Sequence, residues 1–357
     1  MKPIIGITLG DPAGIGPEIT IRALADPKLY EICRPLVIGD VSFLEWAKHI
    51  AGYPELEIHG VDTPGEGRYK PGIIDVLELH AADRASVPVG EISAGGGDAA
   101  FAYVKKAVQL AMEGEIEATV TNALNKEALN LAGHHYSGHT EIYAAFTHTA
   151  SYSMMLAWKN LRVVHVSTHV SLAEACRLVK KDRILEKIKL AHEACVRMGI
   201  QRPGIAVAGL NPHCGEGGLF GREEIEEIQP AVQAARELGI LAEGPLPADT
   251  VFSKARGGWY DCVVAMYHDQ GHIPLKVLGF TYDRTRQEWS AVEGVNITLG
   301  LPIIRTSVDH GTAFDQAGCG TASERSLVNA IRYSVLLAGR RGGEAGNMVS
   351  GEKEKAN

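Results

Sequence analysis

The stretch from Val263 to Lys276 constrains the fold of this chain more than any other. It begins with a run of β-branched and small apolar residues, which predicts a buried parallel strand. Gly271 and Pro274 then interrupt the pattern, and we expect a loop that carries two histidines, an aspartate and a lysine. Open α/β sheets bind their ligands just beyond the carboxyl ends of such strands. The loop is therefore a candidate ligand site.

Two other stretches share this design. Residues 162–169 and 204–213 are apolar and end in His169 and His213, just as the stretch above runs into His268. A single histidine at a strand end is usually a hydrogen-bonded polar residue, but three equivalent ones suggest a metal site. Neutral imidazole suits zinc and related divalent ions, and three ligands leave coordination positions open for substrate. The working hypothesis is a three-histidine metal site.

Two further histidines fit the same description less well. His165 lies inside its strand and we expect it to be buried, whereas His272 is a candidate for substrate contact.

Other polar residues could bind an anionic substrate. Lys276, Asn296 and Arg305 follow the third histidine, and Arg305 within an apolar strand needs a partner. His139 and Thr140 fall at an expected helix start, where free N–H groups attract anions. Thr140 could instead be the N-cap residue.

Strands alternate with helical patterns along the chain, which predicts an α/β fold with a parallel sheet. We expect irregular structure or edge strands over residues 60–97, a helix from Arg222 to about Leu238, and a surface loop over 281–293. Residues 340–357 are rich in glycine and charge, which predicts disorder.

Composition excludes some classes of function. The formal net charge of −8 argues against nucleic acid as a partner, because phosphate backbones bind basic surfaces. No apolar run reaches the length of a membrane span, and the chain starts directly in a strand without a signal peptide. The six scattered cysteines predict reduced thiols and a cytoplasmic protein.

With these residues in place, the chain resembles the 4-hydroxythreonine-4-phosphate dehydrogenase family from about Pro3 to about Ile331. Long motifs in a fixed order carry the resemblance: residues 10–18 (GDPAGIGPE), 137–141 (SGHTE), 211–213 (NPH) with Gly215-Glu216, 267–271 (YHDQG), 294–298 (GVNIT) and 305–312 (RTSVDHGT).

The resemblance implies an isocitrate/isopropylmalate-dehydrogenase-like fold, with two α/β/α domains and a cleft between them. We place the first domain at residues 1–125 plus 305–345, the second at 126–304, and a disordered tail at 346–357. The resemblance also implies a homodimer in which one metal histidine comes from the partner subunit.

The family's functional positions map onto residues of this chain. The implied metal ligands are His169, His213 and His268. The implied substrate-binding residues are His139, Thr140, Lys276, Asn296 and Arg305. We take Asp249 and Asp269 as candidates for proton transfer or for orienting the histidines. Gly215, Glu216 and Gly218 are the candidate cofactor-binding residues.

The implied chemistry is oxidation of a secondary alcohol by NAD to a β-keto acid, followed by decarboxylation assisted by the metal. NADP is the alternative to NAD; zinc fits the ligands best, with magnesium, manganese and cobalt as alternatives. The chain lacks a GxGxxG motif, which agrees with a cofactor bound outside a Rossmann fold.

Two substrates agree with the resemblance. Residues 272–276 and 312–315 look like the branch that acts on D-threonate or D-erythronate 4-phosphate and yields dihydroxyacetone phosphate. The alternative is 4-hydroxythreonine 4-phosphate, the substrate of vitamin B6 biosynthesis. Two alternative functions of other classes are a metallohydrolase of a phosphorylated sugar acid and a binding module without catalysis.

Overall fold

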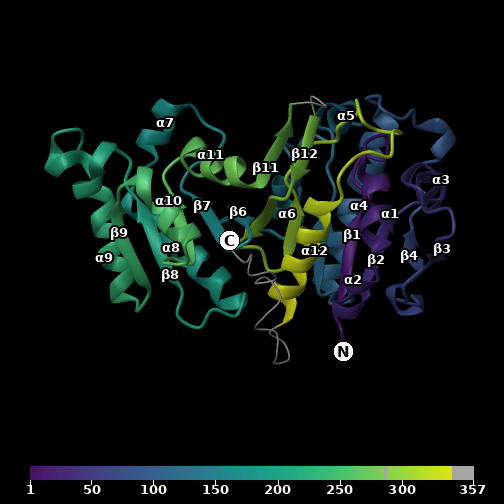
Figure 1. Cartoon of the computed structure of the whole chain (residues 1–357), viewed down its shortest axis with the longest axis horizontal. Helices are drawn as coiled ribbons and strands as arrows, with labels where there is room; N and C mark the ends of the chain where they lie inside the picture. The colour runs from purple at the N-terminus through teal and green to yellow at the C-terminus, as the bar shows by residue number, and fades with distance from the viewer. Residues whose placement is uncertain (285–287, 340–357) are drawn as a thin grey trace. The chain divides into compact units, whose positions relative to one another are not determined.

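The computed structural model describes residues 1–284 and 288–339 (Figure 1). These residues form two compact units. The first unit contains Met1–Tyr152 and Tyr282–Gly339, and the second contains Ser153–Thr281. These bounds differ from those predicted at 125/126 and 304/305, because the segments 126–152 and 282–304 belong to the first unit. The expected disordered tail lies outside the described residues.

The first unit is built on a mainly parallel sheet with the order β3-β4-β2-β1-β5-β14-β13. Only β13 runs antiparallel to its neighbour β14 within this set. The strands are β1 (Ile4–Thr8), β2 (Arg34–Gly39), β3 (Glu57–Val61), β4 (Ile73–Glu78), β5 (Ala118–Thr121), β13 (Val295–Leu299) and β14 (Arg305–Val308). The region 60–97, expected to be irregular or at an edge, thus contributes an interior strand, β4.

Helices of the first unit follow local signals in the sequence. Ser93 caps α4 by accepting a hydrogen bond from the Gly96 N–H, and Gly114 ends this helix in the left-handed conformation. The helices are α1 (Gly16–Leu24), α2 (Pro27–Ile32), α3 (Val41–Ala51), α4 (Ala94–Glu113), α5 (Lys126–Leu131), α6 (His139–Phe146) and α12 (Arg325–Ala338). Apolar residues of α4, α5 and α6 pack with Leu301 and Ile303 in one buried cluster. This packing fixes the start of α6, where His139 lies.

The second unit contains the three strands that lead to the histidines. Its sheet has the order β6-β7-β10-β8-β9. The strands are β6 (Ser153–Trp158), β7 (Leu161–His165), β8 (Gly204–Ala208), β9 (Leu241–Leu246) and β10 (Cys262–Ala265). β7, β10 and β8 are parallel neighbours, so their carboxyl ends meet at one edge. The α/β class that we predicted from the alternating pattern is confirmed.

Helices of the second unit cover its sheet. The helices are α7 (Leu172–Arg177), α8 (Lys181–Arg197), α9 (Gln229–Glu237), α10 (Ala248–Arg256) and α11 (His268–Gly279). Phe252 of α10 and Leu275 of α11 belong to one buried cluster with β-strand residues such as Val263. Burying a side chain of this size contributes about 1.5–3 kcal/mol, so this cluster holds both helices against the sheet.

The predicted loop after β10 is wrong, because His268 is the first residue of helix α11. Gly271 and Pro274 both lie inside this helix. Both residues have low helix propensity. The apolar contacts of Leu275 with the sheet stabilise the helix in spite of them.

The predicted surface loop over residues 281–293 is also wrong. β11 (Phe280–Asp283) and β12 (Glu288–Val292) form a two-stranded sheet. The helix expected from Arg222 begins as one π-helical turn, Glu224–Ile228, before α9. Within the described ranges, no helix combines the length and the apolar character needed to cross a membrane.

We expect Gly271→Ala to destabilise the protein by about 1–3 kcal/mol, the usual cost of overpacking. A methyl group at this position would overlap Nε2 of His165 and Cγ1 of Val163 on β7. Thermal unfolding followed by circular dichroism measures the effect. Gly257→Ala is the matched control, because Gly257 has a φ of −72° and an added Cβ would meet its nearest atoms at 3.4 Å. Equal melting temperatures for the two variants would contradict the close approach of α11 to β7.

Candidate functional site

His169 and His268 lie together in the second unit. His169 follows β7 by four residues, and His268 opens α11 directly after β10. Their ring centroids are 5.8 Å apart. Two imidazoles on one zinc ion, with Zn–N distances of about 2.0–2.1 Å, would place their centroids roughly 5 Å apart. The pair is thus close to the spacing that a shared divalent ion requires.

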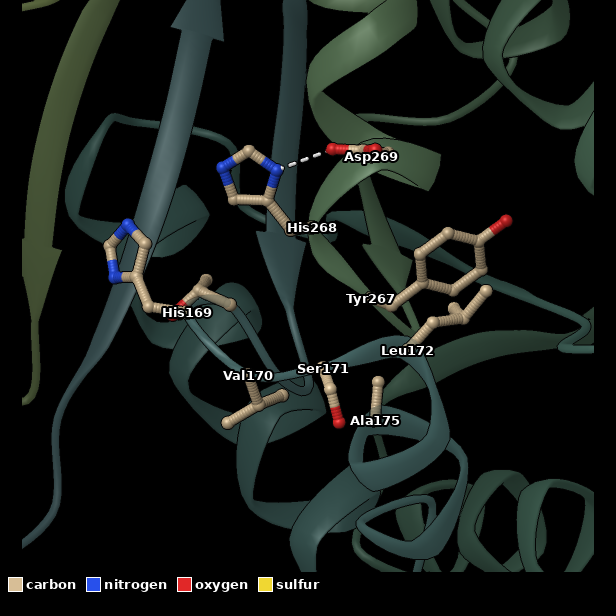
Figure 2. Close-up of a pocket in the computed structure, with 9 residues that line it drawn as sticks. His169, Val170, Ser171, Leu172, Ala175, Tyr267, His268 and Asp269 are labelled. Atoms are coloured by element: carbon tan, nitrogen blue, oxygen red, sulfur yellow. Dashed lines mark hydrogen bonds and ion pairs between the residues drawn. The ribbon is translucent and has the colours of Figure 1, made fainter.

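These two histidines line a pocket of about 450 Å³ (Figure 2). In Figure 2 both imidazole rings lie on one side of the pocket and Tyr267 lies on the other. Apolar side chains in the segment after β7 and on α7 form much of the remaining wall. The lining residues are Thr168, His169, Val170, Ser171, Leu172, Ala175, Tyr267, His268 and Asp269.

Asp269 fixes the chemical form of His268. Its Oδ1 lies 2.7 Å from His268 Nδ1. When ionised, the carboxylate can only accept, so Nδ1 carries the proton and Nε2 is left with a lone pair. Figure 2 shows that this second nitrogen points to the side on which His169 lies. A carboxylate–histidine pair of this kind is the usual support of a metal-binding imidazole.

His213 stands apart from this pair. It lies in a tight turn, Pro212–Gly218, that follows β8. Its side chain is 68% exposed and its Nδ1 lies 3.5 Å from Glu216 Oε1. Within the described part of the chain, no set of three histidine, cysteine or acidic side chains is arranged to hold a metal ion. A single chain therefore brings together two of the three predicted ligands.

The turn that carries His213 is conformationally strained. Five consecutive residues, 213–217, have positive φ angles, and three of them are not glycine: His213, Cys214 and Glu216. Each non-glycine residue in this region costs about 1–2 kcal/mol. The predicted cofactor residues Gly215 and Gly218 have φ angles of 78° and 104°, which glycine adopts without strain.

Glu224 supports this strained turn and was not among the predicted site residues. It is buried, and Oε1 accepts hydrogen bonds from the N–H groups of Leu210 (2.8 Å) and Asn211 (2.7 Å). Oε2 accepts a third from Asn211 Nδ2 at 2.9 Å. Asp249 lies in the first turn of α10. Burial is the largest cause that raises the pKa of Cys214, followed by the charges of Glu224 and Asp249, so Asp249 lies beside the same turn. An acidic residue in a helical pattern gives no sequence signal for such a role.

The predicted substrate residues of the first unit gather around Arg305. Thr298 of β13 lies directly opposite Arg305 of β14, and Asn296 is two residues away on the same face. The Arg305 guanidinium lies 5.4 Å from the ring centre of Tyr143 on α6. His139, the first residue of α6, is close enough for Arg305 to lower its pKa, after the larger effect of burial.

Arg305 is a buried cation that only neutral groups bind. Its Nη1 donates to Thr298 Oγ1 at 2.9 Å and its Nη2 to Thr121 Oγ1 at 2.7 Å. Burial lowers its pKa to about 10, while Tyr143 and Glu141 act in the opposite direction. Among the described residues no carboxylate lies within ion-pair distance of it, and its Nε has no partner. A buried arginine in this state is suited to an incoming phosphate or carboxylate.

Neighbouring buried polar atoms in the first unit also lack partners. Nε2 of His139 and Oδ1 of Asn296 form no hydrogen bond to the described residues. Asn296 Nδ2 donates to Asp309 Oδ1 at 3.1 Å, which leaves its amide oxygen available. Thr140 is the second residue of α6 and Gly138 is the N-cap, so the alternative reading of Thr140 as a cap is wrong.

Lys276 belongs to the second unit. It is exposed in the last turn of α11, with Nζ 5.2 Å from the ring centre of Phe280. The two further histidines that the sequence analysis set aside from the metal set are both buried: His165 is 2% and His272 is 7% exposed. The expectation that His165 is buried is confirmed.

Asp11 is another of the buried ionisable groups of the first unit. It lies in the glycine-rich loop between β1 and α1 and is 1% exposed. Oδ1 accepts from the Ala13 N–H at 3.0 Å, whereas Oδ2 has no partner among the described residues. Burial raises the pKa of this carboxyl to about 6, against the weaker effect of the Ala13 hydrogen bond.

This shift predicts a pH-dependent stability. The folded pKa lies above that of the unfolded chain, so the contribution of Asp11 is fully present below about pH 4 and is lost as the pH rises through about 6. We expect Asp11→Asn, which mimics the protonated form, to be neutral near pH 4 and to stabilise the fold by about 1–3 kcal/mol above pH 7. Thermal unfolding across this pH range measures the difference.

Asp26→Asn is the control for this experiment. Asp26 caps α2 from a half-buried position, where asparagine caps about equally well. A difference between wild type and Asp11→Asn that stays constant from pH 4 to pH 8 would contradict the assignment to Asp11.

Comparison with known proteins places this geometry in context. The sequence model described as "Pyridoxal phosphate biosynthetic protein PdxA" matches residues 31–334. D-threonate 4-phosphate dehydrogenase of Cupriavidus necator is 50% identical over 340 residues, which is 95% of this chain and 98% of that protein. 4-hydroxythreonine-4-phosphate dehydrogenase of Desulfosudis oleivorans is 51% identical over 336 residues, 94% of this chain and 96% of that protein.

A solved structure agrees with these relatives. The crystal structure of 4-hydroxythreonine-4-phosphate dehydrogenase from Klebsiella pneumoniae superimposes with a TM-score of 0.83 at 44% identity, covering 94% of this chain and all of that one.

Proposed function

The chain belongs to the PdxA family, and from that premise we propose that it is an NAD-dependent dehydrogenase of a four-carbon, 4-phosphorylated hydroxy acid. The reaction that we propose is oxidation of a secondary alcohol followed by decarboxylation. D-threonate or D-erythronate 4-phosphate is the preferred substrate and dihydroxyacetone phosphate the product. The main support for the proposal is that a relative that is 50% identical over 95% of this chain is named for this class of substrate.

We assign the binding of the substrate's anionic end to the group around Arg305. A buried guanidinium without a carboxylate partner supports this assignment, because an incoming phosphate would form charge-assisted hydrogen bonds with it. The unpaired atoms of His139 and Asn296 supply further polar contacts, and we include Thr140 and Lys276 as carried over from the family.

We assign the divalent metal, zinc by preference, to His169, His213 and His268. The donor set fits such an ion, since the first and third of these rings are 5.8 Å apart and Asp269 leaves Nε2 of His268 available. A partner subunit completes the set in a homodimer. When bound, the ion supplies positive charge that lowers the pKa of the substrate hydroxyl and stabilises the negative charge that develops on oxygen.

The remaining roles follow from the side chains at hand. Asp269 orients His268, and Asp249, next to the turn that carries His213, is the second candidate for moving the hydroxyl proton. Gly215, Glu216 and Gly218 are the proposed contacts of NAD, with NADP as the alternative. The reaction releases one proton from the alcohol and transfers a hydride to the nicotinamide.

A second substrate, 4-hydroxythreonine 4-phosphate, has support of its own, because the relative named for it is 51% identical to this chain. The motifs at residues 272–276 and 312–315 favour the sugar acids instead. Both substrates share the phosphate and the secondary alcohol, and they differ in the group next to the carboxylate.

Side-by-side kinetics with the 4-phosphates of D-threonate, D-erythronate and 4-hydroxythreonine tests the proposal. We expect the near-ultraviolet absorbance of reduced nicotinamide to rise fastest with one of the sugar acids. Decisive preference for the amino acid would overturn the choice of substrate. Product without reduced nicotinamide would indicate a hydrolase, and binding without product would indicate a binding module.

A further inference from the structure

Two buried histidines outside the proposed metal set lie near His268: His272 contacts it directly, and His165 lies behind His272 with its ring centroid 6.5 Å from that of His268. The rings of His268 and His272 are stacked, with centroids 3.6 Å apart and planes within 12° of parallel. The ring of His165 lies on β7 with its centroid 4.7 Å from that of His272. Since His165 and His272 are 2% and 7% exposed, both rings are withdrawn from solvent.

The stacking arises from the helix itself. His268 and His272 are four residues apart at the start of α11, so their side chains lie on one face of the helix. Nδ1 of His272 lies 2.9 Å from the carbonyl oxygen of His268. A carbonyl can only accept, so this nitrogen donates and the bond fixes the orientation of the His272 ring.

The surroundings leave the His272 ring little freedom. Gly271 allows α11 to approach β7 so closely that any side chain there would overlap His165. His165 therefore closes the space beneath His272, and a ring held on one side by packing and at one nitrogen by a hydrogen bond cannot easily rotate. It offers a fixed flat surface to the imidazole of His268.

His268 is consequently held at two places. Asp269 binds Nδ1 in the plane of the ring, and His272 covers one face of it. Both constraints leave Nε2 free, and together they define its direction. Asp269 alone would not do so, because its side chain is 70% exposed.

We propose that His272 is a positioning residue that holds the ring of His268 in the orientation needed to bind the metal. His165 forms the layer beneath it, and neither residue is itself a metal ligand. The inference rests on the proposed function, because it assumes that His268 binds the ion.

Binding of Co²⁺ to the full-length, metal-free enzyme, followed by its visible absorbance, tests this proposal without any need for turnover. We expect His272→Leu to weaken Co²⁺ binding by about 10–100-fold, the effect usual for residues that support a metal ligand. His272→Phe retains a flat ring next to His268 but loses the hydrogen bond, and we expect an affinity between those of wild type and His272→Leu. Activity of His272→Leu should recover at saturating metal.

His192→Leu on α8 is the control for replacing a helical histidine of the same unit, and we expect wild-type affinity from it. Wild-type Co²⁺ affinity in His272→Leu, with or without a lower melting temperature, would show that the residue only packs and would overturn the proposal. The variant His268→Ala separates the proposed ligand role of His268 from the proposed positioning role of His272. If that variant also bound Co²⁺ like wild type, the ligand assignment itself would fall, and this inference with it.

Discussion

Replacing His213 with Ala is expected to lower turnover by about 10³-fold or more, because the proposed metal ion would supply several kcal/mol of stabilisation to the transition state. The variant should also lose bound metal on gel filtration, as measured by elemental analysis. His213 is largely exposed in its turn and packs against little, so the melting temperature of the metal-free protein should not change.

Cys214→Ala is the matched control for this variant. Cys214 lies in the same strained turn, with a φ of 56°, and has no role in the proposed ligand set. We expect its turnover and metal content to equal those of wild type. Full activity of His213→Ala without added metal would show that the metal has no role in the reaction.

Replacing Arg305 with Met is expected to lower kcat/KM for the phosphorylated substrate by about 10²–10³-fold. Removing one partner of a buried charged pair costs about 2–5 kcal/mol, and this cost arises only when the anion is bound. The free enzyme should be at least as stable as wild type, since the buried guanidinium lacks an anionic partner among the described residues. Steady-state kinetics and thermal unfolding of the same preparation measure both effects.

Arg162→Met is the corresponding control in the second unit. Arg162 is also buried, but its Nη1 binds the backbone carbonyls of Asn160 (3.1 Å) and Asp261 (3.2 Å). We expect this variant to lose stability and to keep its kcat/KM. An Arg305→Met enzyme with wild-type kcat/KM and reduced stability would instead assign Arg305 to the fold.

Much of this architecture could be predicted from the sequence. The β-branched runs before His169, His213 and His268 identified three strands, and these strands are parallel neighbours in the second unit. Arg305 stood out because a charge in an apolar strand needs a partner, and its guanidinium is indeed buried. Strong local patterns of this kind predict structure well, because the apolar residues that form them are buried in the folded protein.

The helix after β10 could not be predicted in this way. Gly271 and Pro274 are poor helix formers, and local propensity gave the wrong answer. Glycine is required here by a contact with His165, which is more than a hundred positions away in the sequence. Such a requirement becomes visible only when β7 and α11 are seen packed together.

The supporting residues escaped prediction for a related reason. Glu224 holds the turn of His213 through backbone N–H groups of Leu210 and Asn211. His272 was singled out only as a candidate for substrate contact, and the stacking of its ring on that of His268 was not foreseen. Backbone hydrogen bonds and ring contacts leave no characteristic spacing in the sequence. The pairing of β11 with β12 was missed because those segments lack an apolar period.

We propose that one metal site draws its histidines from two subunits, since within the described part of a single chain His169 and His268 lie together without His213. Mixing the inactive variants His213→Ala and His268→Ala, after dissociation and reassociation, tests it most directly. A hybrid dimer then contains one site with all three histidines and one site that lacks two. We predict that metal binding and turnover return to about one half of the wild-type level per hybrid dimer, as expected for one intact site of two. A mixture that forms hybrid dimers and yet stays inactive would contradict the shared site.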